Sequence, residues 1–284
     1  MRSYFLKFGA KIIDSDNYKA IKCLYLLLLQ PKRFTMILNS VSVDCVIFGF
    51  DKSGLRVLLN QIDKEALQQS LPEQISSDQI KKLYEQHPVL TSDRFWSLFG
   101  GHVPEDKDLD EYAKSLLFQA TGLHNVFLQQ IRTFGSLKRV PYTRVITVGY
   151  YSLINPDHYN LKQSSIAKSL QWFNLNELPP LCFDHDKIIE QALIKLRREV
   201  MYHPVGFHLL PEKFTLTEIQ SLYEVILNKK MDTRNFRKKI TNMELLIDSG
   251  KKQQNVAHRA ARLYSFDTKV YEKLKEEGLN FRIE

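Results

Sequence analysis

Residues 100–123 read GGHVPEDKDLDEYAKSLLFQATGL and predict a loop, a helix and a second loop. The two glycines follow an apolar run at 95–99 that is typical of a strand. The acidic residues that come next are typical of a helix N-terminus, because the helix dipole favours negative charge there. Asp108 with Glu111 three residues later predicts a capping box. Apolar residues at helical spacing predict one buried face, and Gly122 predicts a left-handed residue that ends the helix.

This stretch resembles the Nudix box, whose pattern is G-x5-E-x7-R-E-U-x-E-E-x-G-U with U an aliphatic residue. The first glycine of the pattern falls on Gly101, the last on Gly122, and two aliphatic positions on Leu117 and Leu123. The Glu and Arg positions are occupied, in chain order, by Lys107, Ser115, Leu116, Gln119 and Ala120. Nudix hydrolysis uses several carboxylates on one helix face to hold divalent cations, which prefer oxygen ligands. We therefore expect a Nudix scaffold that is not an enzyme and has no catalytic residues, metal ligands or cofactor.

Five acidic residues gather around the start of the predicted helix: Glu105, Asp106, Asp108, Asp110 and Glu111. They fit the ordinary acidic start of a helix. Alternatively, Glu105, Asp106, Asp108 and Glu111 form a displaced metal-binding set. The chain would then be a Nudix-type pyrophosphohydrolase acting on ADP-ribose or a nucleoside diphosphate. That alternative requires carboxylates that project together into a cleft.

The composition of the 284 residues, 44% hydrophobic and 25% charged, is typical of a globular protein of about two domains. Three widely spaced cysteines, Cys23, Cys45 and Cys182, favour a reducing compartment over a disulfide framework or a structural zinc site. No apolar run reaches the roughly 18 residues of a membrane span. No small-residue cleavage site follows the apolar run at 23–29. We therefore expect a cytoplasmic protein.

Positive charge is concentrated at the two ends of the chain. Residues 1–35 hold seven Lys/Arg and two Asp/Glu, residues 36–183 hold fourteen and fifteen, and residues 184–284 hold nineteen and fifteen. This asymmetry favours a polyanionic partner. Residues 1–35 are interpreted as a leader that is poorly attached or as an over-called translation start, because a complete domain can begin at Met36.

Residues 36–183 are expected to form one domain with strands at 41–50, 55–59, 127–135 and 144–154. A polar insertion at about 60–92 either lies beside the pocket mouth, where loops often set specificity, or is a surface decoration. Residues 184–284 are expected to form a second domain. It begins with a long helix at 187–201.

The second domain contains the pattern of a helix-turn-helix followed by a wing. Thr215 or Thr217 caps a helix that runs to Asn228, and Asp232 caps a short helix at 232–240. A strand at 244–247, a polar tip at 248–258 and a returning strand at 259–266 predict the wing. A short helix at 271–277 closes the domain.

Several short motifs across both halves are similar to those of the Nudix-related transcriptional regulators, in their arabinose-regulator and NAD-metabolism-regulator branch. These motifs are TFG at 133–135, LLP at 209–211, FTL at 214–216 and NFRKK at 235–239. The resemblance covers about residues 36–275. It implies an α+β fold, in which a Nudix-like α/β/α sandwich with a mixed sheet is followed by a winged helix-turn-helix domain. It also implies a homodimer on a palindromic operator.

Residues 229–262 hold ten Lys/Arg and three Asp/Glu, a local balance of +7. Such a patch meets the electrostatic requirement of nucleic-acid binding, and the second helix of a helix-turn-helix faces base edges. We expect Arg234, Asn235 and Lys238 near the groove of double-stranded DNA. The expected phosphate contacts are Arg237, Lys239, Lys251, Lys252 and Arg259. A plain protein-interaction module is the alternative.

The resemblance also implies a small-molecule effector in the former substrate pocket. Because the metal-site acids are missing, the sequence favours a sugar such as arabinose over ADP-ribose or another nucleotide-sugar. Candidate effector contacts are Phe50, Trp96, Arg132 and Tyr150. The protein would then sense its effector, transmit the change through the helix that follows Asp184, and control an operon of carbohydrate or other metabolism.

Overall fold

The computed structural model describes residues 41–51, 54–63, 65, 67, 75–124, 126–140, 143–159, 161, 169–254, 259–277 and 281–283. The leader at 1–35, the start at Met36 and part of the insertion at 60–92 lie outside the described residues. The predictions made for those segments therefore stay predictions.

Strand β1 (Val41–Asp51) is the centre of the molecule's main sheet. Its side chains alternate between two hydrophobic clusters, with Val43, Cys45 and Ile47 in one and Val46 and Phe48 in the other. A strand covered on both faces needs an almost continuous apolar run, and VSVDCVIFGF supplies it. The strand predicted at 41–50 is thus confirmed.

The sheet has the order β3-β2-β1-β6-β5, and β4 and β7 pair off this path with β1 and β2. Its strands after β1 are β2 (Gly54–Asp63), β3 (Arg94–Ser97), β4 (Phe99–His102), β5 (Gln129–Phe134), β6 (Ile146–Ile154) and β7 (Ser169–Asn174). The β1–β6 pair is parallel, whereas β1 runs antiparallel to β2 and β4. The sheet is therefore mixed, as expected.

The two glycines that open the stretch 100–123 lie inside a strand, not after one. Gly100 and Gly101 belong to β4 and pair with Asp44 and Val43 of β1. A Cβ atom on Gly100 would overlap the Asp44 carboxylate, so the close approach of β4 to β1 requires glycine there. No local pattern in the sequence indicates this strand pairing.

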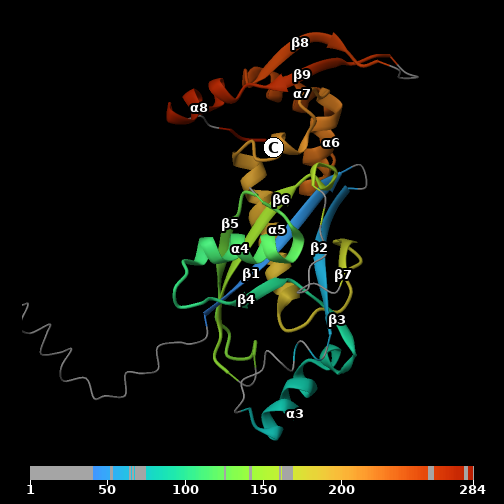
Figure 1. Ribbon diagram of the computed structural model, residues 1–284. Coiled ribbons are helices and arrows are strands. Elements are labelled where there is room, and N and C mark those ends of the chain that lie inside the picture. The colour runs from blue at the N-terminus through green and yellow to red at the C-terminus, as the bar shows by residue number, and fades with distance from the viewer. Residues whose placement is uncertain are drawn as a thin grey trace, which may run out of the picture. The chain divides into compact units, whose positions relative to one another are not determined.

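Helices cover both faces of the sheet (Figure 1). Helix α4 (Leu109–Thr121) packs on the face that carries Val43, Cys45 and Ile47. Helix α5 (His185–Tyr202) packs on the opposite face, where it contacts β1, β5 and β6. Gly122 ends α4 at φ 74°, which confirms the predicted C-cap. The predicted capping box is wrong, because Asp108 occupies the N-cap but its side chain makes no capping hydrogen bond.

The described part of the insertion contains α3 (Ser77–Gln86) and the 3-10 helix η1 (Pro88–Thr91). Leu83 and Leu90 pack with Phe95 and Cys182 in a small separate hydrophobic cluster. This packing ties the insertion to the strand β3 and to the residues that precede α5.

The last third of the chain forms a winged helix. It comprises the 3-10 helix η3 (Phe207–Leu209), α6 (Leu216–Leu227), α7 (Thr233–Asn242), β8 (Leu246–Lys252), β9 (Arg262–Phe266) and α8 (Thr268–Glu276). Strand β8 pairs antiparallel with β9 and extends to Lys252, beyond the end predicted at 247. A register shift between Asp248 and Lys252 interrupts the ladder, which explains why the pattern of this segment resembles a loop.

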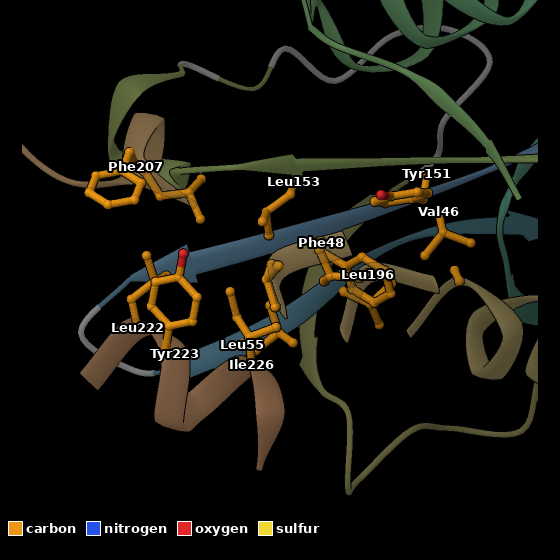
Figure 2. Packing of buried hydrophobic residues seen from close by; sticks show 14 of the residues in the cluster. Val46, Phe48, Leu55, Tyr151, Leu153, Leu196, Phe207, Leu222, Tyr223 and Ile226 are labelled. Atoms are coloured by element: carbon orange, nitrogen blue, oxygen red, sulfur yellow. The ribbon is translucent and has the colours of Figure 1, made fainter. Parts of the chain in front are cut away.

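One hydrophobic cluster joins the sheet to the winged helix (Figure 2). Leu222, Tyr223 and Ile226 of α6 lie against the cluster that contains Leu55 and Leu153 of the sheet. Polar contacts reinforce this joint. The Asn155 side chain donates to the Leu209 carbonyl at 2.9 Å, and the Arg197 Nε donates to the Ile226 carbonyl at 2.9 Å. The sheet and helix α6 are thus packed as continuous protein interior.

The expected α+β class is confirmed, with its α/β/α sandwich over a mixed sheet and its C-terminal winged helix-turn-helix. Among the described residues, no helix is long and apolar enough to cross a membrane.

Candidate functional site

The two helices of the helix-turn-helix begin at strong caps. The Thr215 hydroxyl accepts from the Glu218 backbone N–H, and the Glu218 carboxylate accepts from the Thr215 N–H, so both halves of a capping box are present. Asp232 accepts from the Asn235 N–H at 2.8 Å and caps α7. Of the two threonines predicted as caps, Thr215 has that role.

A polar clamp holds the turn between α6 and α7. The Glu224 carboxylate accepts hydrogen bonds from the Met231 N–H, the Gln220 side chain and the Lys230 ammonium, each at 3.0 Å. Gln220 also donates to the Thr233 hydroxyl at 3.2 Å. The hydrogen bond from Met231, followed by those from Gln220 and Lys230, lowers the pKa of Glu224 from 4.5 to about 2. This clamp fixes where α7 begins.

Helix α7 has a buried face and a charged face. Phe236 and Ile240 are 5% and 1% exposed and pack into the main cluster. The remaining positions include Arg234, Asn235, Arg237 and Lys238, all exposed, and Lys239, which is half-buried. In the wing, Lys251 and Lys252 on β8 and Arg259 before β9 are exposed.

Three of these predicted DNA contacts meet at one cavity of about 600 Å³ between the start of α6, α7 and the wing. They are Arg237, Lys252 and Arg259. The Arg237 guanidinium donates to the Thr217 hydroxyl at 3.1 Å, which orients it along the cavity. Arg262, which the sequence reasoning missed, also lines this cavity and pairs with Asp248 at 3.2 Å. The other predicted contacts on α7 and Lys251 do not line it.

The Nudix-box positions on α4 lie partly in the protein interior. Leu116 and Ala120, which stand where the pattern has glutamates, are 8% and 2% exposed and pack in the cluster beneath α4. Gln119 and Lys107 are exposed, and Lys107 pairs with Glu111 at 3.7 Å. Among the described residues, no three His, Cys, Asp or Glu side chains are grouped so that they could hold a metal ion.

The acidic residues at the start of α4 have different partners. Glu105, Asp106 and Asp108 are exposed in the turn before the helix and at its N-cap. Asp110 instead accepts hydrogen bonds from the Tyr150 hydroxyl and the Gln130 amide, and these bonds lower the pKa of Asp110. Burial, followed by the bond to Asp110, raises the pKa of Tyr150. The tyrosine predicted as an effector contact thus connects β6 to α4.

The four predicted effector contacts do not converge. Tyr150 packs in the cluster under α4, whereas Phe50 and Trp96 pack against the main cluster. The ring of Trp96 lies edge-on to the ring of Phe173, with 4.8 Å between the ring centroids. Arg132 on β5 is exposed and lines two cavities beside α5, of about 310 and 520 Å³. Phe50, Trp96 and Tyr150 line neither of these cavities.

The two cavities share Arg132 and Gln191, and we call the groove that they form the β5–α5 groove. Its further cationic lining residues are Lys138, Arg139, Lys187, Lys195 and Arg198, and its acidic ones are Asp184, Glu190 and Glu199. His87, from the insertion, also lines it, and the buried His87 Nε2 has no hydrogen-bond partner among the described residues. Burial lowers the pKa of His87. Sequence reasoning missed this set, because its members come from segments far apart in the chain.

Arg139 and Asp184, which line this groove, belong to a cluster of charges that also includes Asp44. Arg139 is 5% exposed, and its guanidinium contacts the carboxylates of Asp184 at 2.8 Å and Asp44 at 3.4 Å. It also donates to the Thr147 hydroxyl. Burial raises the pKa of Asp44 to about 7 although Arg139 opposes the shift. Arg139 therefore links β1, β6 and the start of α5 to the loop that lines the groove.

A family model described as the NrtR DNA-binding winged helix domain matches residues 206–266. The chain is 29% identical over 237 residues to the ADPR responsive transcriptional repressor NtrR of Acinetobacter baylyi, a match that covers 82% of this chain and 84% of that protein. It is also similar to the crystal structure of Shewanella oneidensis NrtR complexed with a 27mer DNA. That likeness has a TM-score of 0.62 and 27% identity, and covers 82% of this chain and 95% of that one.

A shorter match is to the ADP-ribose pyrophosphatase of Methanocaldococcus jannaschii. It has 30% identity over 98 residues and covers 34% of this chain and 57% of that enzyme.

Proposed function

We propose that the chain is a Nudix-related transcriptional regulator that binds operator DNA through α7 and the wing. The single observation that carries the proposal is the division of α7 into two faces. Phe236 and Ile240 anchor it in the core, while Arg234, Asn235 and Lys238 are left exposed. Arg and Asn are the side chains whose geometry suits guanine and adenine edges in the major groove.

The phosphate contacts in this proposal are Arg237, Lys239, Lys251, Lys252 and Arg259, joined by Arg262. The cavity where Arg237, Lys252 and Arg259 meet supports a phosphate-binding role, because converging cations neutralise the DNA backbone. The likeness to Shewanella oneidensis NrtR, whose crystals contain a 27mer DNA, supports the same role.

The test is a selection of duplexes with the full chain, followed by fluorescence polarisation on the selected duplex across a salt series. Arg237→Ala combined with Lys238→Ala should weaken binding and lower the slope of log K against log salt by about 1, because Arg237 is the phosphate contact of the pair and Lys238 lies near the groove. Lys81→Ala combined with Lys82→Ala removes the same charge from two exposed positions of α3 and is the control. Equal effects of the two double variants would reject α7 as the contact surface.

For the effector, we propose a nucleotide-derived compound of the ADP-ribose class bound in the β5–α5 groove. The similarity to an ADPR responsive repressor of Acinetobacter baylyi supports this class over the sugar that the sequence favours. The groove supports it too, since Arg132, Lys138 and Lys187 can neutralise a diphosphate without a metal ion. The unpartnered His87 Nε2 can accept or donate a bond to such a ligand.

Calorimetric titration separates the two effector classes. ADP-ribose should bind in buffer containing a chelator, and Arg132→Ala should weaken it about tenfold, since a charge-assisted hydrogen bond is lost. Arg144→Ala, at an exposed arginine that lines neither cavity, is the matched control. Binding of arabinose in place of ADP-ribose would favour the sugar.

We propose sensing without hydrolysis. Support comes from Leu116 and Ala120, because a carboxylate at either position would lie in an apolar core. The match to the ADP-ribose pyrophosphatase motivates the competing function, a hydrolase that uses the exposed acids Glu105, Asp106, Asp108 and Glu111. Incubation with ADP-ribose and Mg²⁺ or Mn²⁺ decides between them, since turnover abolished by Asp108→Ala would establish the hydrolase.

The proposal extends to a cytoplasmic homodimer that controls a metabolic operon. Operators with two-fold symmetry are bound by dimers with two-fold symmetry. A protein that binds operator DNA acts in the compartment that contains that DNA. Light scattering on the DNA complex tests the dimer, because a single protomer per selected palindrome would contradict it.

A further inference from the structure

A second cavity lies where the sheet meets the helix-turn-helix. It has a volume of about 420 Å³ and is separate from the β5–α5 groove, with which it shares no lining residue. Its walls come from the start of β2, the end of β7, α5, α6 and the turn that follows α6. A ligand there would touch the sandwich and the DNA-reading domain at once.

The lining of this cavity is polar and cationic. Arg197, Lys229 and Lys230 line it with one acid, Glu224. Glu224 is already engaged by Lys230 at 3.0 Å and by the Met231 N–H, so its charge does not neutralise the other two cations. Uncompensated positive charge facing one cavity favours an anionic occupant.

Arg197 is held in place for such an occupant. Its Nε donates to the Ile226 carbonyl at 2.9 Å, near the C-terminus of α6, which fixes the plane of the guanidinium. In the part of the chain that the structure describes, its two terminal amino groups have no hydrogen-bond partner. A fixed planar donor pair is the arrangement that binds phosphate oxygens in a bidentate manner.

The remaining lining residues supply neutral donors and acceptors. The Ser221 hydroxyl and the Asn228 side chain line the cavity, and neither has a hydrogen-bond partner among the described residues. Asn228 has the left-handed backbone of the α6 C-cap, at φ 52°, and so lies at the beginning of the turn that leads to α7. An anion bound here would contact this turn directly.

We propose that this cavity is a binding site for a small phosphate-bearing anion, held by Arg197 and Lys229, that ties the helix-turn-helix turn to the sandwich. The occupant is distinct from the effector of the β5–α5 groove. The cavity is large enough for a phosphorylated metabolite, and its lining suits a phosphate group next to hydroxyls.

The experiment titrates the full chain with pyrophosphate and follows the melting temperature, with sodium chloride at matched ionic strength as the reference. Pyrophosphate should raise the melting temperature beyond the chloride reference. Lys229→Ala should weaken the apparent affinity about tenfold, as expected for one charge-assisted bond. Arg197→Met keeps the apolar stem and should do the same. Lys114→Ala, an exposed lysine on α4, is the matched control.

Two readouts keep this site apart from the β5–α5 groove. Because the β5–α5 groove can also take a diphosphate, the titration is repeated in Arg132→Ala. The stabilisation by pyrophosphate that remains in this variant should be lost when Lys229→Ala is added. In hydrogen exchange, pyrophosphate should slow the amides of residues 226–231 in the native chain but not in Lys229→Ala. An unchanged affinity in both Lys229→Ala and Arg197→Met would overturn the proposal, as would loss of the affinity in Arg132→Ala alone.

Discussion

Glu224→Gln should destabilise the turn before α7 without changing its shape. The carboxylate accepts three hydrogen bonds, and its pKa is lowered from 4.5 to about 2. That lowering corresponds to about 3 kcal/mol at about 1.36 kcal/mol per pKa unit. Lys230 is 93% exposed, so its share is small. The amide of Gln still accepts from Met231, and we therefore expect a loss of about 2 kcal/mol in the free energy of unfolding.

The effect of Glu224→Gln on the free energy of unfolding should depend on pH. A carboxylate with a lowered folded-state pKa stabilises the fold above pH 4.5, and the contribution is lost as the pH falls towards 2. Urea unfolding at a series of pH values should show a constant difference between the native chain and Glu224→Gln near neutrality. That difference should shrink between pH 4.5 and 2. Glu276→Gln, at an exposed position of α8, should change little at any pH. A difference for Glu224→Gln that is absent at pH 7, or equal at both ends of the series, would refute the clamp.

Three further changes test the sandwich by chemical unfolding. Arg139→Met should cost about 3–5 kcal/mol because it leaves the buried carboxylate of Asp44 and the half-buried one of Asp184 without their partner, and a neutral effect would contradict the ion-pair role. Gly100→Ala should cost about 1–3 kcal/mol or more because its Cβ meets Asp44, whereas Gly135→Ala, whose Cβ meets only the far end of a side chain at 3.9 Å, should be nearly neutral; equal costs would reject the packing reason. Because burial raises the pKa of Asp44 from 3.8 to about 7, the stability that this group contributes at low pH is lost as the pH rises through that window. Asp44→Asn should remove this slope, and an unchanged slope would assign it to another group.

Local signals made much of the fold predictable. The apolar run of β1 and the αL glycine at 122 depend on interactions within or beside their own segment, and both are confirmed. Asp232 capping α7 is confirmed for the same reason. The Asp108 capping box fails because a sequence pattern does not determine the side-chain rotamer, and here the acid stays in solvent.

Contacts between segments that are distant in the chain could not be predicted from the sequence. The β5–α5 groove combines His87, Arg132 and Lys187 from an insertion, a strand and a helix, and only the fold brings them together. The sequence predicts that Tyr150 lines the effector pocket, yet its hydroxyl donates a hydrogen bond to Asp110, forty residues away. The exposed and buried faces of α7 were predictable because they follow from helical spacing. The placement of Arg237 and Arg259 at one cavity was not, because it depends on how the wing packs beside α6 and α7.

The most direct measurement is the affinity of the full chain for its selected duplex, with and without ADP-ribose, in buffer that contains a chelator. The chain should bind the duplex at low salt, and ADP-ribose should change that affinity about 5–150-fold, the usual range of allosteric coupling. Arg132→Ala should keep the DNA affinity and lose most of the response. Failure to bind any duplex at low salt, or DNA binding that ADP-ribose leaves unchanged, would contradict a sensing sandwich joined to a DNA-reading winged helix.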